Sequence, residues 1–126
     1  MDFSSQRFVD VVVAVPVGQI DHPNAESLQR ALAPILEAAV PASGALVLDF
    51  SGVSYISSMG LRILLMAAKQ LRAANARIAV AALQPVVSEI FGIARFNHVL
   101  EIFPDVRTAL EHVSGPALAA YDAAAA

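Results

Sequence analysis

The feature of this sequence that most constrains its fold is an alternation of apolar runs with segments of helical periodicity. The apolar runs are short and rich in valine, leucine and isoleucine, which is typical of strands, and they comprise Arg7–Ile20, Ala45–Phe50, Arg77–Leu83 and Val99–Phe103. The segments between them carry apolar residues at spacings of three and four, which predicts helices. Strands that alternate with helices favour an α/β architecture, in which parallel strands are joined by right-handed crossovers.

The predicted strands differ in the place that they are expected to take in the sheet. Ala45–Phe50 is apolar with little alternation, so we expect a central strand that is covered on both faces. Arg7–Ile20 is long enough for one or two strands, with Asp10 as a turn between them. Pro16 has no N–H to donate, so the strand should be irregular or lie at an edge there. A further short extended piece is predicted at Ser54–Ile56.

The first predicted helix, Asp21–Ala39, contains an internal conflict. Asp21 or His22 can cap its start, and Pro23 suits a first turn, where the backbone amides have no helical partner. Pro34 removes a backbone hydrogen bond from within the pattern, so we expect a kink or a break there.

Three further helices are predicted downstream. The longest begins at Ser58 and ends near Asn75, a residue type that accepts the left-handed conformation at a helix end. Shorter helices are expected from Pro85 to Gly92 and after Asp105.

Length and composition favour one small domain. With 126 residues and no repeat or linker, the chain is expected to form a single domain over residues 1–115, followed by an alanine-rich, flexible tail over residues 116–126. The longest stretch without a charged residue, Phe50–Leu61, is far shorter than the roughly 18 apolar residues that cross a bilayer. Because no secretory signal is visible and cysteine is absent, we predict a cytoplasmic location without membrane insertion.

Residues of the types that bind nucleic acids or metals, or that act in catalysis, are few and do not cluster in the sequence. The net charge of −3 argues against a nucleic-acid binder, because such proteins neutralise phosphates with clustered lysine and arginine. The histidines at 22, 98 and 112 lack metal-ligand spacing, and Ser58 lacks the first glycine of a nucleophile elbow. Isolated carboxylates are expected to be caps or solvated groups, and they include Asp21, Asp49 and Glu89. The sequence therefore predicts neither an enzyme nor a cofactor site.

Three stretches, in a fixed order, resemble the signatures of a known family. "VGQIDHPNAESL" (Val17–Leu28) is similar to a Gly-x-(Leu/Ile)-Asp-x-x-(Asn/Thr)-Ala-x-x-Leu motif. "LVLDFSGVSYISSMGLRILL" (Leu46–Leu65) resembles the strand, loop and helix that follow this motif in STAS domains, and "LQPVVSEIFGIARFNHVLEIFPDVRTAL" (Leu83–Leu110) resembles their C-terminal half. The similarity extends over Val11–Val113, and the chain is identified as a member of the family shared by sulfate transporters and anti-sigma factor antagonists.

The resemblance implies a STAS fold, a small mixed sheet of four to five strands with about four helices packed mainly on one side. For a stand-alone chain it implies an anti-sigma factor antagonist. In its unphosphorylated form, such a protein binds an anti-sigma factor that is also a GHKL-type serine kinase, and this binding frees the sigma factor. Phosphorylation of one serine ends the binding, and a PP2C-type phosphatase restores it.

The family's phosphorylation motif, Asp-Ser-(Ser/Thr)-Gly, lies at the start of the second helix. By position, Ser58 matches the phosphorylated serine and Gly60 the glycine, whereas Ser57 stands where aspartate is common and Met59 where serine or threonine is common. Three interpretations stay open: phosphorylation of Ser58, phosphorylation of Ser57, or a serine that only caps the helix. Gly60 would either let the backbone of a partner approach closely or simply weaken the first turn.

The resemblance also predicts the surface that binds the partner. The residues that would line it lie at the starts of two helices, and they are Asp21, His22, Asn24, Ser57, Ser58, Met59, Gly60 and Arg62. For Asp21 and Asn24 a capping role is equally open, and for Arg62 a solvated one. Two rival functions are a STAS scaffold subunit of a transporter or signalling complex without a phosphoswitch, and a small-molecule sensor, which no phosphate-binding loop supports.

Overall fold

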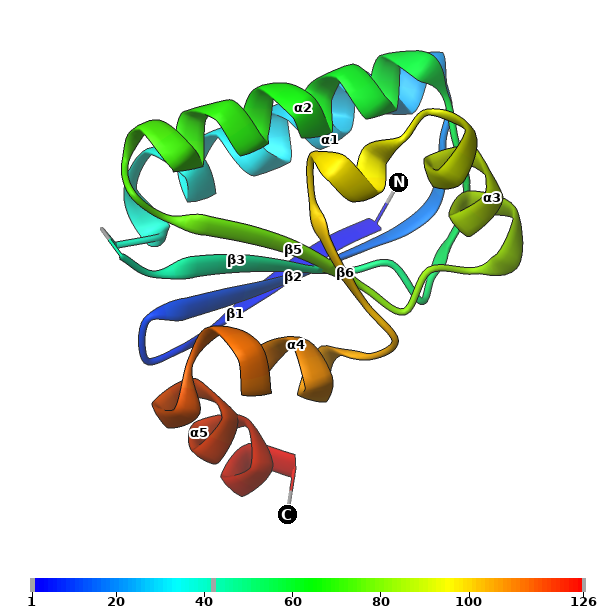
Figure 1. The fold of residues 1–126 in the computed structure, drawn as a ribbon. Helices are drawn as coiled ribbons and strands as arrows, with labels where there is room; N and C mark the ends of the chain where they lie inside the picture. The colour runs from blue at the N-terminus through cyan, green and yellow to red at the C-terminus, as the bar shows by residue number, and fades with distance from the viewer. Residues whose placement is uncertain (1, 42, 126) are drawn as a thin grey trace.

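Six strands form one mixed sheet, and helices cover both of its faces (Figure 1). The computed structural model describes residues 2–41 and 43–125. The strand order across the sheet is β1-β2-β3-β5-β6, and β4 pairs with β2 beyond β3. The strands are β1 (Asp2–Phe8), β2 (Val11–Ile20), β3 (Ala45–Asp49), β4 (Val53–Ile56), β5 (Arg77–Ala81) and β6 (Glu101–Phe103).

The predicted α/β architecture with a mixed sheet is confirmed, although the sheet has more strands than expected. The strand at the sheet edge is β1, which forms a hairpin with β2. The turn between them includes Asp10, so of the two alternatives for Arg7–Ile20 the structure has the two strands. The polar residues of β1 before Arg7 carry little strand signal. Helices α1, α2 and α3 lie on one face, and α4 and α5 cover the other (Figure 1). The helices are α1 (His22–Pro34), α2 (Ser58–Ala73), α3 (Pro85–Ile93), α4 (Val106–Val113) and α5 (Gly115–Ala125).

β2 organises the sheet because its two halves pair with different neighbours. On one side it is antiparallel to β1 from Val11 to Val17. On the other side, Val11–Ala14 is parallel to β3, and Gly18–Ile20 is parallel to β4. Pro16 lies between these two parts, where the parallel partner changes, so the predicted irregular position of this proline is confirmed.

Side chains of the central strands alternate between two cores. In β3, Leu46 and Leu48 pack with α1, α2 and α3, whereas Ala45 and Val47 pack against α4. The second core contains mainly small side chains, with alanines at positions 45, 79, 81, 109 and 117. Because both faces are covered, β3 shows almost no alternation in its sequence, as expected for a central strand.

Two helix ends lie where the sequence predicts them. α1 ends at Pro34, and the chain continues as a π-helical turn, Ile35–Ala39, in which the N–H of Val40 donates to the carbonyl of Ile35 at 3.3 Å. The break expected from the missing N–H of proline is therefore confirmed. Asn75 follows α2 with φ of 57°, the left-handed conformation expected for it.

The last segment of the chain is ordered by contacts with α4 and β1. The sequence predicts a flexible tail from residue 116, whereas the structure has helix α5 there. The ring of Tyr121 packs edge-on against Phe8 at a centroid distance of 5.4 Å, and Arg107 of α4 donates to Asp122 at 3.1 Å, which raises the pKa of that guanidinium. These contacts join residues far apart in sequence, and a run of alanines gives little amphipathic signal for them.

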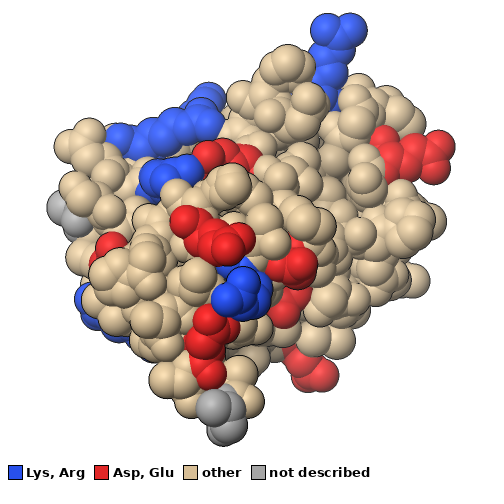
Figure 2. Space-filling model, turned by 60° about the horizontal axis from the view of Figure 1, so that its bottom comes forward, with Lys and Arg blue, Asp and Glu red and all other residues tan. Residues whose placement is uncertain are grey.

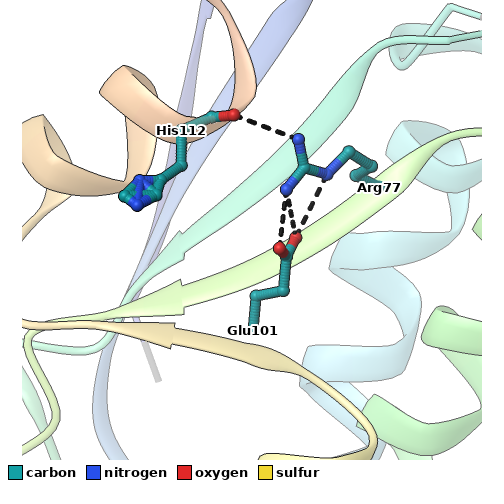
Figure 3. Close-up of polar contacts among 3 residues, drawn as sticks. All are labelled: Arg77, Glu101 and His112. Carbon is teal, nitrogen blue, oxygen red and sulfur yellow. Dashed lines mark hydrogen bonds and ion pairs between the residues drawn. The ribbon is translucent and has the colours of Figure 1, made fainter.

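Arg77 connects three elements at the end of the sheet where β5 begins (Figure 3). Its guanidinium donates to the carboxylate of Glu101 on β6, with a shortest distance of 2.6 Å, and to the carbonyl of His112 on α4 at 3.1 Å. Both charged side chains are nearly half exposed, so the ion pair is expected to contribute about 1 kcal/mol or less. Its structural effect is to hold the short edge strand β6 and the end of α4 in place.

The turn of the β1–β2 hairpin contains a strained residue. Val9 has φ of 59° and is 57% exposed, and a β-branched side chain is disfavoured in the left-handed region by about 1–2 kcal/mol. Val9→Gly is therefore expected to raise the free energy of unfolding by roughly 0.5–1 kcal/mol, after the entropic cost of glycine. Urea unfolding followed by circular dichroism measures this. Val17→Gly, in the body of β2, is the control and should lower the free energy of unfolding. An equal decrease of this free energy in both variants would show that Val9 is not strained.

Candidate functional site

Two helices begin side by side where β2 and β4 end. These strands are parallel, and Ile20 lies opposite Ile56 in the register. The N–H of Ser57 donates to the carbonyl of Ile20 at 2.8 Å. Asp21 and Ser57, which follow the two strands, therefore begin α1 and α2 next to each other. The paired strands explain how two distant segments of the sequence form one surface.

The structure separates the roles of the two adjacent serines. Ser57 has extended backbone angles and is the N-cap of α2, and its Oγ accepts a hydrogen bond from the N–H of Gly60 at 3.2 Å. Its side chain is only partly exposed. Ser58 is the first residue within the helix, and it is exposed. The capping role that the sequence leaves open thus belongs to Ser57, and the hydroxyl of Ser58 is accessible.

Gly60 is buried under the first turn of α2. A Cβ atom at this position would lie 2.7 Å from Cγ2 of Ile20 and 2.7 Å from Cγ1 of Ile56. The close approach that requires a glycine is therefore made within the chain, between α2 and the ends of β2 and β4. This corrects the expectation that Gly60 offers its surface to a partner, because a buried α-carbon between two isoleucines is not available for contact.

Asp21 and Asn24 hold the start of α1. Asp21 is the N-cap, and its Oδ1 accepts from the N–H of Asn24 at 3.0 Å. The Nδ2 of Asn24 donates to the carbonyl of Gln19 at 2.8 Å. Both side chains therefore have the capping function that the sequence leaves open, and both stay partly exposed. His22 is exposed beside them.

An apolar groove borders Ser58. It has a volume of about 340 Å³ and runs between the start of α2 and the end of α3. Two of its residues are apolar side chains with large exposure, Tyr55 at 42% and Ile93 at 79%. The residues that line the groove are Tyr55, Ile56, Ser58, Leu61, Ile90, Ile93 and Ala94. A large exposed isoleucine beside a tyrosine is the kind of surface that proteins use for contact with other proteins.

The contribution of α3 to this surface is not part of the sequence-based prediction. The buried residues of α3 are Val87 and Phe91, which are four apart and define its inner face. Ile90 is partly buried at the edge of that face, whereas Ile93 lies outside it. The departure of Ile93 from the helical pattern is the signal that could have pointed to it. The order of strands then brings α3 into contact with β4, next to Ser58.

The remaining predicted site residues have separate surroundings. Met59 is partly buried and packs against the main core, so only part of it can reach a partner. Arg62 is exposed, one turn after Ser58 on α2. The structure therefore brings Ser58, Arg62, His22, Asp21 and Asn24 to one end of the molecule.

Residues 2–41 and 43–125 lack the features of several other classes of site. In this part of the chain, no group of histidine, cysteine, aspartate and glutamate side chains could hold a metal ion. No helix formed by these residues has the length and apolar character needed to cross a membrane. On the face formed by α4 and α5, acidic and basic side chains of the described residues are interspersed (Figure 2), so that face has no field of a single sign to attract a nucleic acid.

Comparison with known proteins gives consistent results from sequence and structure. The family profile of the STAS domain matches residues 3–109. BtrV of Bordetella bronchiseptica, named as a candidate anti-sigma factor antagonist, is 35% identical over 104 residues, which cover 82% of this chain and 84% of the relative. A protein of Mycobacterium tuberculosis, named as a candidate anti-anti-sigma factor, is 33% identical over 101 residues, with coverages of 79% and 68%.

The fold is also that of a solved anti-sigma factor antagonist, SpoIIAA of Bacillus. Its unphosphorylated form has a TM-score of 0.73 and 19% identity, covering 89% of this chain and 96% of SpoIIAA. Its phosphorylated form has a TM-score of 0.67 and 17% identity, with coverages of 90% and 100%. Because the family profile and a relative at 35% identity each cover most of the sequence, this chain belongs to the STAS domain family.

Proposed function

We propose that this protein is an anti-sigma factor antagonist whose partner docks on the apolar groove while Ser58 is unmodified. The observation that carries the proposal is the position of the Ser58 side chain, exposed at the border of the groove while its neighbour Ser57 serves as the helix cap. The names of BtrV and of the relative from Mycobacterium tuberculosis support the same function. The partner is an anti-sigma factor that is also a GHKL-type serine kinase.

Phosphorylation of Ser58 would end this binding without unfolding the protein. The start of a helix tolerates an anion because its backbone amides are unpaired and its dipole is positive there. A phosphate adds about −1.5 to −2 charges at neutral pH. Beside the apolar groove that charge would lose its contacts with water when the partner docks, and removing a charge from water costs several kcal/mol. A PP2C-type phosphatase would restore the binding-competent form.

The proposal predicts opposite results for two substitutions of Ser58. Ser58→Ala should bind the anti-sigma kinase as tightly as the parent, whereas Ser58→Asp should bind at least about 30-fold more weakly, equivalent to 2 kcal/mol. Isothermal titration calorimetry with each purified GHKL-type kinase of the host measures this. Ser57→Ala is the matched control: it should keep the affinity and lose about 1 kcal/mol of folding stability with the helix cap.

Intact mass after incubation with the kinase and ATP gives the second measurement. The parent and Ser57→Ala should each gain one phosphate, and Ser58→Ala should gain none. If Ser58→Asp binds as tightly as the parent, or if no phosphorylated form arises, the phosphoswitch is wrong. A stable stoichiometric complex without phosphorylation would instead support the scaffold function.

A further inference from the structure

Ser58 and Arg62 lie one above the other on the exposed side of α2. Both residues are exposed, and their spacing of four places them on the same face of the helix, about 5–6 Å apart at Cβ. Residues in an α-helix are rotated by about 100° from one to the next, so Ser58 lies between Arg62 on one side and Leu61 on the other. Leu61 lines the apolar groove. On the helix surface, Ser58 therefore lies between a residue that lines the apolar groove and Arg62.

Arg62 has no carboxylate partner in the part of the chain that the structure describes. The ion pairs found there involve Arg77 with Glu101, and Arg107 with Glu111 and Asp122. The first turn of α2 contains no acidic residue. The charge of Arg62 is thus available to an anion that appears nearby, and no carboxylate in that turn would repel the anion.

We propose that Arg62 binds the phosphate on Ser58 within the same helix. This rests on the proposed phosphorylation of Ser58. An anion four residues before a cation is the favourable orientation of such a pair, and arginine can hold two phosphate oxygens at once. Phosphorylation then changes the charge of the docking surface in two ways. The phosphate adds negative charge, and its ion pair with Arg62 makes the positive charge of the guanidinium unavailable to a partner.

The inference can be tested independently of any kinase by genetic incorporation of phosphoserine at position 58. The second pKa of the phosphate is followed by phosphorus NMR. The ion pair favours the dianion, so Arg62→Gln should raise this pKa by roughly 0.3–0.5, and Arg62→Lys should raise it less. In the parent, the NMR signal of the Arg62 Nε–H should shift when the phosphate is present.

Two controls separate Arg62 from other nearby charges. Lys69→Gln removes a cation further along α2, and His22→Gln removes the titratable group at the exposed start of α1; Asp21 and Glu89, on α1 and α3, stay in place in every variant. Neither control should change the phosphate pKa. An unchanged pKa in Arg62→Gln, or an equal change in His22→Gln, would overturn the inference. Because the phosphate is installed directly, this failure differs from failure of the proposed function, which would appear as the absence of kinase-dependent phosphorylation.

Discussion

Gly60→Val is expected to lower the free energy of unfolding by about 3 kcal/mol, and Gly60→Ala by roughly 1–2 kcal/mol. A Cβ atom at this position meets Ile20 and Ile56 at 2.7 Å. The atoms that it meets, Cγ2 and Cγ1, are attached directly to the branched Cβ atoms of buried side chains, so they cannot move aside without a rotamer change. The loss is expected even though alanine within a helix is otherwise about 1 kcal/mol more favourable than glycine. Urea unfolding followed by circular dichroism measures the effect.

Gly92 offers the matched control for this prediction. It also lies within a helix, α3, but a Cβ atom added there meets nothing within 4 Å. Gly92→Ala should therefore raise the free energy of unfolding by up to about 1 kcal/mol. If Gly60→Ala proved as stable as Gly92→Ala, packing against the isoleucines would not be the reason for the glycine.

Loss of the anti-sigma partner is the expected result of Ile93→Asn and of Tyr55→Ala. These side chains supply the exposed apolar surface of the groove beside Ser58. Central aromatic and apolar residues of an interface each contribute 2 kcal/mol or more when they are contact hot spots, so each substitution should weaken binding at least about 30-fold. Because both side chains are exposed, folding stability should change by no more than about 0.5 kcal/mol. Calorimetric titration and urea unfolding separate the two effects.

Met66→Gln is the control for the position of the docking surface. Met66 is 51% exposed on α2, but it lines a different groove, between α1 and α2, with Leu32, Leu36 and Ile63. This substitution should leave the affinity within about threefold of the parent, equivalent to 0.7 kcal/mol. If instead Met66→Gln removed binding and Ile93→Asn did not, the partner would dock between α1 and α2, and the proposed site would be wrong.

Most of the elements could be predicted from the sequence because their signals are local. Pro34 marks the end of α1, Asn75 the end of α2, and Pro85 the start of α3, as the structure shows. Each of these residues acts through its own backbone conformation or its own missing N–H. The part of β1 before Arg7 and the helix α5 were missed, because a polar strand and an alanine-rich helix are specified by long-range contacts such as that between Phe8 and Tyr121.

The candidate site also has one part that the sequence predicts and another that depends on the tertiary structure. The place of Ser58 at a junction between a strand and a helix follows from a change in the spacing of apolar residues, which the sequence alone contains. Two further properties depend on the strand order: the packing of Gly60 against Ile20, and the contact of α3 with β4 that brings Ile93 to the groove. The sequence by itself thus determined that a helix begins at the paired serines, through periodicity and capping. Only the tertiary structure decided which surface that serine adjoins, because the pairing of β2 with β4 and the position of α3 join segments that have no local signal for each other.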